Sequence, residues 1–273
     1  MTTPALPMSP ALAGRLAGDP LVLLLDIDGT LSPIAPRPQD AAIAPATRET
    51  LAALARLSDV HVVAISGRAA QDAARLVGLD SVWIVGNHGI EIAAPGATPE
   101  IHADIARFAE QLSEASTDAR AVVEETPGAI LEDKRWTLSV HQRLVARDAI
   151  AALDARIADI ANKHRLALTH GKEVLELRPT VKIDKGTAAL ELAVRLGALA
   201  GGASLLSGGD DRTDEDMFRA LRSRESRWVT VHVDGGSVYS TAAEFSVPDP
   251  EAMRALLRMV LEQRVARART VAR

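Results

Sequence analysis

The sequence predicts an α/β fold, in which a parallel sheet carries helices on both faces and is interrupted by an α+β insert. Near both ends of the chain, short apolar runs alternate with helical patterns, which is typical of strand–helix–strand units. In the middle, two amphipathic helical patterns lie among short alternating segments. We therefore expect a flexible N-terminus at 1–20, a core built from 21–100 and 181–273, and an inserted domain at 101–180.

The core elements follow from apolar runs of strand length and from the helical spacing between them. In the first part we expect a strand at 21–25, a helix at 45–57, a strand at 60–65, a helix at 69–77 and a strand at 82–85. The pattern returns after residue 200, with strands at 203–207 and 228–233 and helices near 214–221 and 249–264.

The insert is expected to pack two helices on a small, mostly antiparallel sheet. One helical face carries Ile101, Ile105, Phe108 and Leu112, and a second carries Ile150, Leu153, Ile157 and Ile160. The segments "AVVEE", "WTLSVH", "LALTH" and "EVLELR" read as its strands. Turn-forming residues at 93–100 and 178–186 indicate two hinges.

Composition excludes several classes of function. A net charge of −5 offers no basic field for nucleic acid or an acidic membrane, and the absence of cysteine excludes disulfides and thiolate zinc sites. The apolar run before Asp26 is too short for a signal peptide or a membrane span. We expect a cytoplasmic monomer that binds a small molecule.

Two clusters of carboxylates follow predicted strands. "LVLLLDIDGT" places Asp26 and Asp28 after the first strand, and "SGGDDRTDEDMF" places Asp210, Asp211 and Asp214 after a later one. Either cluster alone could form a turn or a helix cap. Together they indicate a ligand site, because the carboxyl ends of parallel strands share one edge of a sheet. Each carboxylate pair about 4 Å apart costs about 1 to 4 kcal/mol unless a cation is present, and oxygen ligands without thiolates favour Mg²⁺. We expect all five aspartates around that ion.

Two further motifs could bind phosphate. "ISGR" places Ser66, Gly67 and Arg68 directly after the second strand, and "IDKG" places Lys185 at a helix start. Hydroxyl, backbone N–H and ammonium groups at such positions bind phosphate oxygens. Lys182 lies close enough in the sequence to compete with Lys185 for this role.

These motifs resemble known families. In order, "DIDGT", "SGR", the "DKG" lysine and "GDDRTDEDMF" resemble the four motifs of the haloacid dehalogenase superfamily of phosphotransferases. "GNHGIE", "LEDKRWTLSVHQR" and "GKEVLELRP" further resemble trehalose-6-phosphate phosphatases. The resemblance implies a Rossmann-like parallel-sheet core with an inserted cap domain. It also implies Mg²⁺-dependent hydrolysis of trehalose 6-phosphate to trehalose and phosphate through an aspartyl-phosphate.

The resemblance also assigns roles to residues. Asp26 would be the nucleophile and Asp28 the general acid/base, with Lys185 as a further catalytic group. Asp26, the Asp28 backbone carbonyl and Asp210 would hold the metal, and either Asp211 or Asp214 could join them. The phosphate would be held by Ser66, Gly67 and Lys185. The implied substrate contacts are Arg68, Asn87, His88, Glu91, Glu132, Lys134, His141, Arg143, Lys172, Glu176 and Arg178.

Three alternatives remain open from the sequence. The enzyme could act on another sugar phosphate, such as a sucrose or mannosylglycerate phosphate. It could be a phosphomutase, or a sugar-phosphate sensor that retains the fold without catalysis. The sensor is disfavoured, because every motif residue needed for turnover is present.

Overall fold

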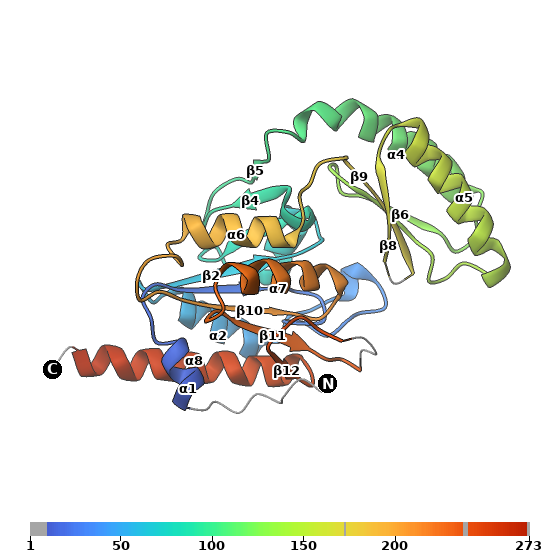
Figure 1. Cartoon of the computed structure of the whole chain (residues 1–273). Coiled ribbons are helices and arrows are strands. Elements are labelled where there is room, and N and C mark those ends of the chain that lie inside the picture. Colours follow the sequence, from blue (N-terminus) through green and yellow to red (C-terminus); the bar gives the residue numbers. More distant parts are fainter. Residues whose placement is uncertain (1–9, 172, 237–239, 272–273) are drawn as a thin grey trace. The chain divides into compact units, whose positions relative to one another are not determined.

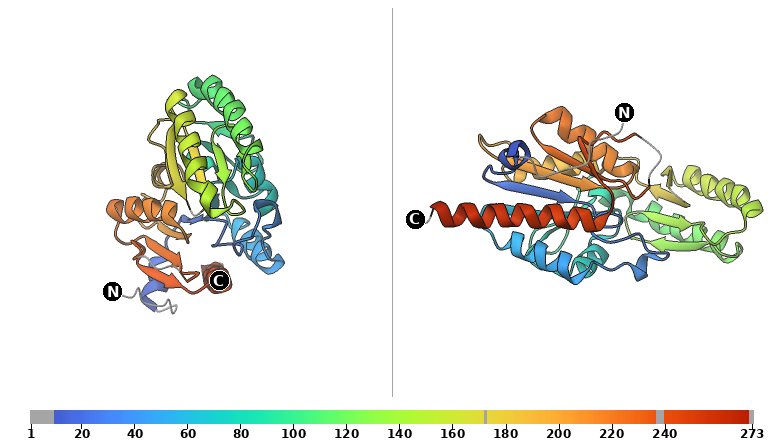
Figure 2. Two further views of the ribbon diagram at one scale, coloured as in Figure 1. Left: turned by 90° about the vertical axis from the view of Figure 1, so that its right-hand side faces the viewer. Right: turned by 90° about the horizontal axis from the view of Figure 1, so that it is seen from below.

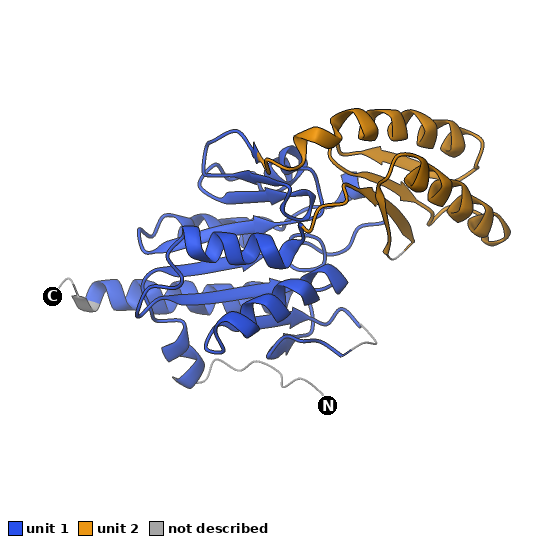
Figure 3. Ribbon diagram, turned by 45° about the horizontal axis from the view of Figure 1, so that its top comes forward, with its two compact units in different colours: residues 1–100, 183–273 blue, residues 101–182 orange. Residues whose placement is uncertain are grey.

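The computed structural model describes residues 10–171, 173–236 and 240–271 (Figure 1). The chain forms two compact units (Figure 3): unit 1 comprises the chain up to Glu100 together with Ile183–Arg273, and unit 2 comprises Ile101–Lys182. No helix within the described ranges is long and apolar enough to cross a lipid bilayer.

Unit 1 is built on a mostly parallel sheet. Among the described residues its strand order is β12-β11-β10-β1-β2-β3-β4-β5. The strands are β1 (Leu21–Leu25), β2 (Val60–Ile65), β3 (Trp83–Gly86), β4 (Glu91–Ala93), β5 (Glu100–Ile101), β10 (Ser204–Gly209), β11 (Val229–Val233) and β12 (Phe245–Val247). The six strands other than β4 and β5 run parallel, whereas β4 is antiparallel to β3. At the carboxyl end of β1, Leu25 pairs with Gly208 of β10 and Ala64 of β2, so the segments that follow these strands emerge at one edge.

Helices cover both faces of this sheet, as Figures 1 and 2 show. They are α1 (Pro10–Arg15), α2 (Pro45–Ala55), α3 (Ala70–Val77), α6 (Lys185–Arg195), α7 (Arg212–Arg224) and α8 (Pro250–Val271). Successive residues of a strand point to opposite faces. Leu23 of β1 therefore packs in the cluster formed with α2, α3 and α8, whereas Leu24 packs in the cluster formed with α6 and α7. The predicted α/β fold is confirmed.

The described part of the N-terminal segment differs from its expected flexibility. Residues 10–15 form α1. Leu12 of this helix and Leu16, which directly follows it, are buried in the core, 3% and 0% exposed. Arg15, the last residue of α1, ties the helix to a distant segment: it donates two hydrogen bonds of 2.7 and 2.6 Å to the Glu244 carboxylate. Leu12 and Leu16 lie four residues apart and so share one helical face. The Ala/Pro/Gly-rich composition conceals this anchoring pair.

Unit 2 packs two helices on a four-stranded antiparallel sheet, of strand order β6-β7-β9-β8. Its elements are α4 (Ala109–Glu124), β6 (Ile130–Asp133), β7 (Leu138–His141), α5 (Arg147–Lys163), β8 (Ala167–Gly171) and β9 (Val174–Arg178). Both helices cover the same face of the sheet (Figure 3).

Two sequence-based assignments in unit 2 are wrong. The segment 121–125 forms the end of α4 rather than a strand, and the first α-helix begins at Ala109 rather than near Ile101. In α4, Ala115, Ala119 and Val122 lie buried at helical spacing, so packing of this stripe outweighs the β propensity of adjacent valines.

Candidate active site

The predicted nucleophile, Asp26, directly follows β1 and lies at the carboxyl edge of the sheet. The Asp26 backbone N–H donates to the carbonyl oxygen of Gly208 at 2.9 Å, and the residue is only 4% exposed. Three residues further, Gly29 adopts a φ of +91°, and a Cβ there would lie 2.0 Å from Oδ2 of Asp210. Glycine is therefore required for both the turn and the close approach of Asp210. The two acidic clusters converge at this turn.

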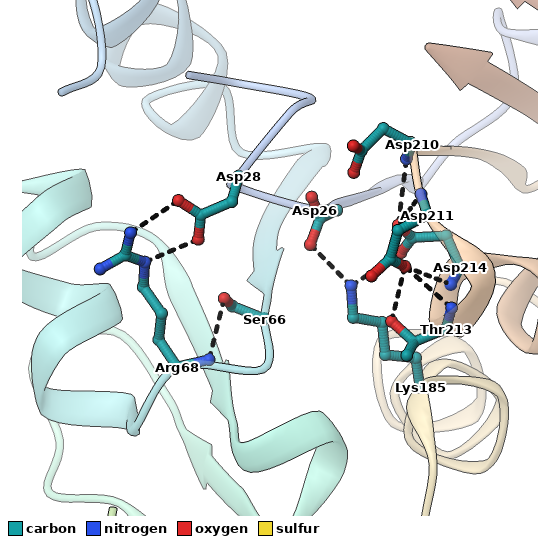
Figure 4. Close-up of polar contacts among 9 residues, drawn as sticks. All are labelled: Asp26, Asp28, Ser66, Arg68, Lys185, Asp210, Asp211, Thr213 and Asp214. Atoms are coloured by element: carbon teal, nitrogen blue, oxygen red, sulfur yellow. Dashed lines mark hydrogen bonds and ion pairs between the residues drawn. The ribbon is translucent and has the colours of Figure 1, made fainter. Parts of the chain in front are cut away.

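Lys185 neutralises part of this charge. It is the first residue of α6, 2% exposed, and its Nζ donates to Oδ1 of Asp26 at 2.6 Å and to Oδ1 of Asp214 at 2.9 Å (Figure 4). Burial by itself lowers the pKa of Lys185, but Asp214 and Asp26 outweigh it and raise that pKa well above its ordinary value. Lys182 is exposed and belongs to unit 2. The geometry thus places Lys185, and not Lys182, beside Asp26.

Asp211 and Asp214 have different structural roles. Oδ1 of Asp211 accepts the N–H groups of Thr213 (2.8 Å) and Asp214 (3.1 Å), so Asp211 is the N-cap of α7. Oδ2 of Asp214 accepts the N–H groups of Asp210 (3.0 Å) and Asp211 (3.2 Å), while its other oxygen meets Lys185. Asp214 therefore braces the turn that carries Asp210.

The residues at this edge fit a bound divalent cation. Oδ2 of Asp26 is buried without a hydrogen-bond partner, and within the described ranges Asp26, Asp210 and Asp214 offer carboxylate oxygens that all lie within 4.8 Å of one another. Burial, together with neighbouring carboxylates, raises the pKa of Asp26 to about 7 and that of Asp210 to about 8. A cation would relieve this repulsion.

The carboxylates of Asp28 and Asp211, also expected at the metal, lie outside this group. The Asp211 carboxylate is used as a helix cap. The Asp28 carboxylate is turned toward Arg68 (Figure 4), whose Nε and Nη2 donate to its two oxygens, each at 2.6 Å. A third nitrogen, Nη1, donates to the carbonyl oxygen of Pro38 at 2.9 Å. Arg68, expected to contact substrate, is engaged with the predicted acid/base.

The predicted phosphate-binding turn follows β2. Ser66 is 1% exposed, and its Oγ accepts the Arg68 backbone N–H at 3.2 Å. A Cβ at Gly67 would lie 2.5 Å from Cε1 of His88, so the imidazole lies directly against this glycine. Asn87, His88 and Glu91 are all buried beside the turn. The structure therefore brings the unit 1 candidates to one sheet edge.

In unit 2, most of the remaining candidates share one face of the sheet. The register aligns Glu132, Ser139, Glu176 and Thr169 in one row across the strands. The apolar residues that alternate with them along each strand face the helices. Ion pairs join the row to its neighbours: His141–Glu132 at 2.9 Å, Lys134–Glu132 at 4.0 Å, Lys134–Glu176 at 3.7 Å and Arg178–Glu176 at 3.8 Å. We call Glu132, Lys134, Ser139, His141, Glu176 and Arg178 the polar face of unit 2.

One described candidate of unit 2, Arg143, lies apart from this face. Arg143 pairs with Glu173 at 2.8 Å, and both side chains are exposed. Lys172 lies outside the described residues.

The family of this chain follows from its match to a family model over most of its length. The family model described as trehalose-phosphatase matches residues 24–251, a range that includes all of unit 2, most of unit 1 and every candidate site residue. The chain belongs to the trehalose-phosphatase family.

Individual relatives agree with this membership. A trehalose-phosphate phosphatase of Mycobacterium tuberculosis (strain H37Rv) is 36% identical over 239 residues, which is 87% of this chain and 60% of that protein. A probable trehalose-phosphate phosphatase of rice (Oryza sativa subsp. japonica) is 34% identical over 254 residues, 91% of this chain and 68% of that protein. The solved structure of a trehalose-6-phosphate phosphatase related protein superposes with a TM-score of 0.78 at 26% identity, covering 90% of this chain and 99% of that one. The chain thus spans about 60% of the length of the mycobacterial relative.

Sequence reasoning missed one member of the polar face in this trehalose-phosphatase family protein. Ser139 is 2% exposed and lies between Glu132 and Glu176 in the register. Its two-residue spacing from His141 was the available signal, since alternate residues of a strand share a face.

Proposed function

We propose that this chain is a Mg²⁺-dependent phosphatase that hydrolyses trehalose 6-phosphate to trehalose and phosphate through an aspartyl-phosphate at Asp26. The observation that carries the proposal is the state of the Asp26 carboxylate. One of its oxygens is held by Lys185, whereas the other is buried without a hydrogen-bond partner beside Asp210. Such a carboxylate is suited to share a cation and to attack a phosphoryl group.

The proposed reaction has two steps: transfer of the phosphoryl group to Asp26, and hydrolysis of the resulting aspartyl-phosphate. An oxygen of Asp26 bonds to phosphorus in line with the breaking ester bond, and Asp28 donates a proton to the departing sugar oxygen. Asp28 then takes a proton from water, whose oxygen attacks the same phosphorus. This second step releases inorganic phosphate and restores the Asp26 carboxylate.

Charge neutralisation is divided among several groups. Mg²⁺ held by Asp26, Asp210 and the Asp28 backbone carbonyl would supply positive charge for the phosphoryl oxygens and lower the pKa of the nucleophile. Lys185 adds a fixed ammonium, and the Ser66 hydroxyl donates to a phosphate oxygen. To face the substrate, the Asp28 carboxylate must give up at least one of the two hydrogen bonds that it accepts from Arg68.

The polar face of unit 2 supports a sugar substrate. Its charged side chains offer both donors and acceptors, as the hydroxyl groups of a disaccharide require. Because these side chains already hold one another through ion pairs, they are ordered before a ligand binds. We propose that this face binds the trehalose hydroxyls.

The test is release of inorganic phosphate from a panel of esters, with and without Mg²⁺. The panel holds trehalose 6-phosphate, sucrose and mannosylglycerate phosphates, and p-nitrophenyl phosphate. The highest kcat/KM is expected for trehalose 6-phosphate with Mg²⁺. A higher value for another sugar phosphate would overturn the substrate. Conversion of one sugar phosphate to its isomer without phosphate release would indicate a mutase. Binding of sugar phosphates without turnover would indicate a sensor.

A further inference from the structure

Two turns at the carboxyl ends of β2 and β3 are interlocked by backbone hydrogen bonds. The Asn87 N–H donates to the carbonyl oxygen of Arg68 at 2.7 Å, and the His88 N–H donates to that of Ser66 at 3.0 Å. In the other direction, the Ser66 N–H donates to the carbonyl oxygen of Val85 at 2.9 Å. The position of the phosphate-binding turn therefore depends on the conformation at 87–88.

That conformation is unusual for residues with side chains. Asn87 and His88 have φ values of 49° and 56°, two consecutive left-handed residues neither of which is glycine. The left-handed region is disfavoured for any residue that carries a Cβ, although asparagine tolerates it better than most. Such a pair persists only where its surroundings hold it in place.

Glu91 supplies that support from β4. Its Oε2 accepts a hydrogen bond of 2.7 Å from Nδ2 of Asn87 and another of 2.9 Å from the N–H of Ala70, the first residue of α3. Glu91 is only 9% exposed and Asn87 is fully buried. One carboxylate oxygen thus ties the left-handed pair to the start of the helix that follows the phosphate-binding turn.

The two turns also approach each other closely at Gly86 and Gly67. A Cβ at Gly86 would lie 2.3 Å from the backbone nitrogen of Ala70, and one at Gly67 would meet the His88 ring at 2.5 Å. The backbone of Gly86 therefore lies against that of Ala70, and the backbone of Gly67 lies against the His88 ring, so a shift at 87–88 is transmitted to 66–68.

We propose that Glu91 is a positioning residue, which holds the 87–88 turn and through it the phosphate-binding turn at 66–68, and that it does not contact the sugar. This inference rests on the proposed function and replaces the expectation that Glu91 binds substrate. It predicts that Glu91 serves every phosphate ester equally, because all of them use the Ser66 turn, whereas a sugar contact would matter only for sugar substrates.

The first experiment measures kcat/KM for trehalose 6-phosphate and p-nitrophenyl phosphate in three variants. Glu91→Ala should lower both values by a similar factor, on the order of 10- to 100-fold, because a catalytic group displaced by about 1 Å can lose about 100-fold. Glu91→Asp keeps the charge but is too short to meet both donors, and should also lower both values. Glu91→Gln keeps a carbonyl acceptor and should restore both to within about fivefold, since neutral hydrogen bonds are about half as strong as charged ones.

A matched control removes another carboxylate that ties two elements of unit 1. Glu244 accepts two hydrogen bonds from Arg15, away from the site, so Glu244→Ala should leave both kcat/KM values unchanged. A loss confined to trehalose 6-phosphate in the Glu91 variants would overturn the inference and identify Glu91 as a sugar contact. Full activity of Glu91→Asp would show that charge alone is needed, which also contradicts it.

A second experiment does not depend on activity. Amide hydrogen exchange of the folded Glu91→Ala protein should be faster at Ala70, Asn87 and His88 than in the unsubstituted protein, with the β1 and β10 amides unchanged. Unchanged exchange at these three amides would overturn the inference even if the enzyme is impaired. If the unsubstituted protein releases no phosphate from any ester, the proposed function fails, while the exchange result still decides the role of Glu91.

Discussion

Replacing Lys185 by methionine tests whether its ammonium is what allows the neighbouring carboxylates to be buried. Nζ contacts Oδ1 of Asp26 at 2.6 Å and Oδ1 of Asp214 at 2.9 Å, and all three side chains are at most 5% exposed. Methionine keeps much of the stem and removes the charge. Breaking a buried ion pair by removing one partner typically costs about 3–5 kcal/mol. We expect a loss of about that size in the free energy of unfolding at pH 8 without Mg²⁺.

The loss should be smaller in acid. Burial raises the pKa of Asp26 to about 7 from an ordinary value of 3.8, and loss of the ammonium raises it further. A carboxyl whose pKa is higher in the folded than in the unfolded protein binds more protons when folded, so stability falls as pH rises through that window. At pH 5 the carboxyl is protonated in the folded variant and needs no cationic partner.

The assay is urea unfolding followed by circular dichroism in EDTA at pH 5 and pH 8. Lys182→Met is the matched control, because Lys182 is exposed, and it should stay within about 0.5 kcal/mol of the unsubstituted protein. In parallel, phosphate release by Lys185→Met should fall by about 100-fold or more, as for loss of one preorganised charge-stabilising group. A destabilisation below about 1 kcal/mol at pH 8, or an equal loss at both pH values, would refute the reasoning.

The remaining predictions concern the nucleophile, the metal and the sugar. Asp26→Asn should abolish steady-state phosphate release while the circular dichroism spectrum is retained, since an amide is neither an adequate nucleophile nor a good Mg²⁺ ligand; activity within about tenfold of the unsubstituted enzyme would contradict the assignment. EDTA should remove activity and Mg²⁺ restore it, whereas Ca²⁺ should fail because of its looser coordination. Because the pKa values of Asp26 and Asp210 are raised to about 7 and about 8, Mg²⁺ should increase Tm more at pH 8 than at pH 5, and an equal increase would argue against these carboxylates as ligands. Glu132→Ala or Lys134→Ala should lower kcat/KM for trehalose 6-phosphate more than tenfold, because a hydrogen bond to a charged group contributes about 1.5–3 kcal/mol, and should leave p-nitrophenyl phosphate nearly unaffected. Equal losses on both esters would place these residues in the support of the fold.

The sequence determined the features that depend on local pattern. A continuous apolar run fixes β1 as a buried strand, and the carboxylates of Asp26 and Asp28 follow it whatever the rest of the chain does. Parallel strands bring their carboxyl ends to one edge, so the pairing of β1 with β10 places Asp210 beside Asp26 as expected. The alternation of polar and apolar residues in β6, β7 and β9 is likewise a local pattern, and it places Glu132, Ser139 and Glu176 on one face of the unit 2 sheet. These inferences succeed because strand periodicity acts over a few residues.

The tertiary structure decided which of several similar side chains occupies each position. Lys182 and Lys185 are the same residue type only three positions apart, but only Lys185 begins α6 and is buried against Asp26. Asp211 and Asp214 lie three residues apart, yet one caps α7 and the other braces Asp210, because Asp211 is the extended N-cap outside the helix whereas Asp214 is the third helical residue. Arg68 and Glu91 carry the charges expected of substrate contacts. Their partners, Asp28 and the start of α3, come from segments distant in the chain, and only folding brings those partners within hydrogen-bond distance.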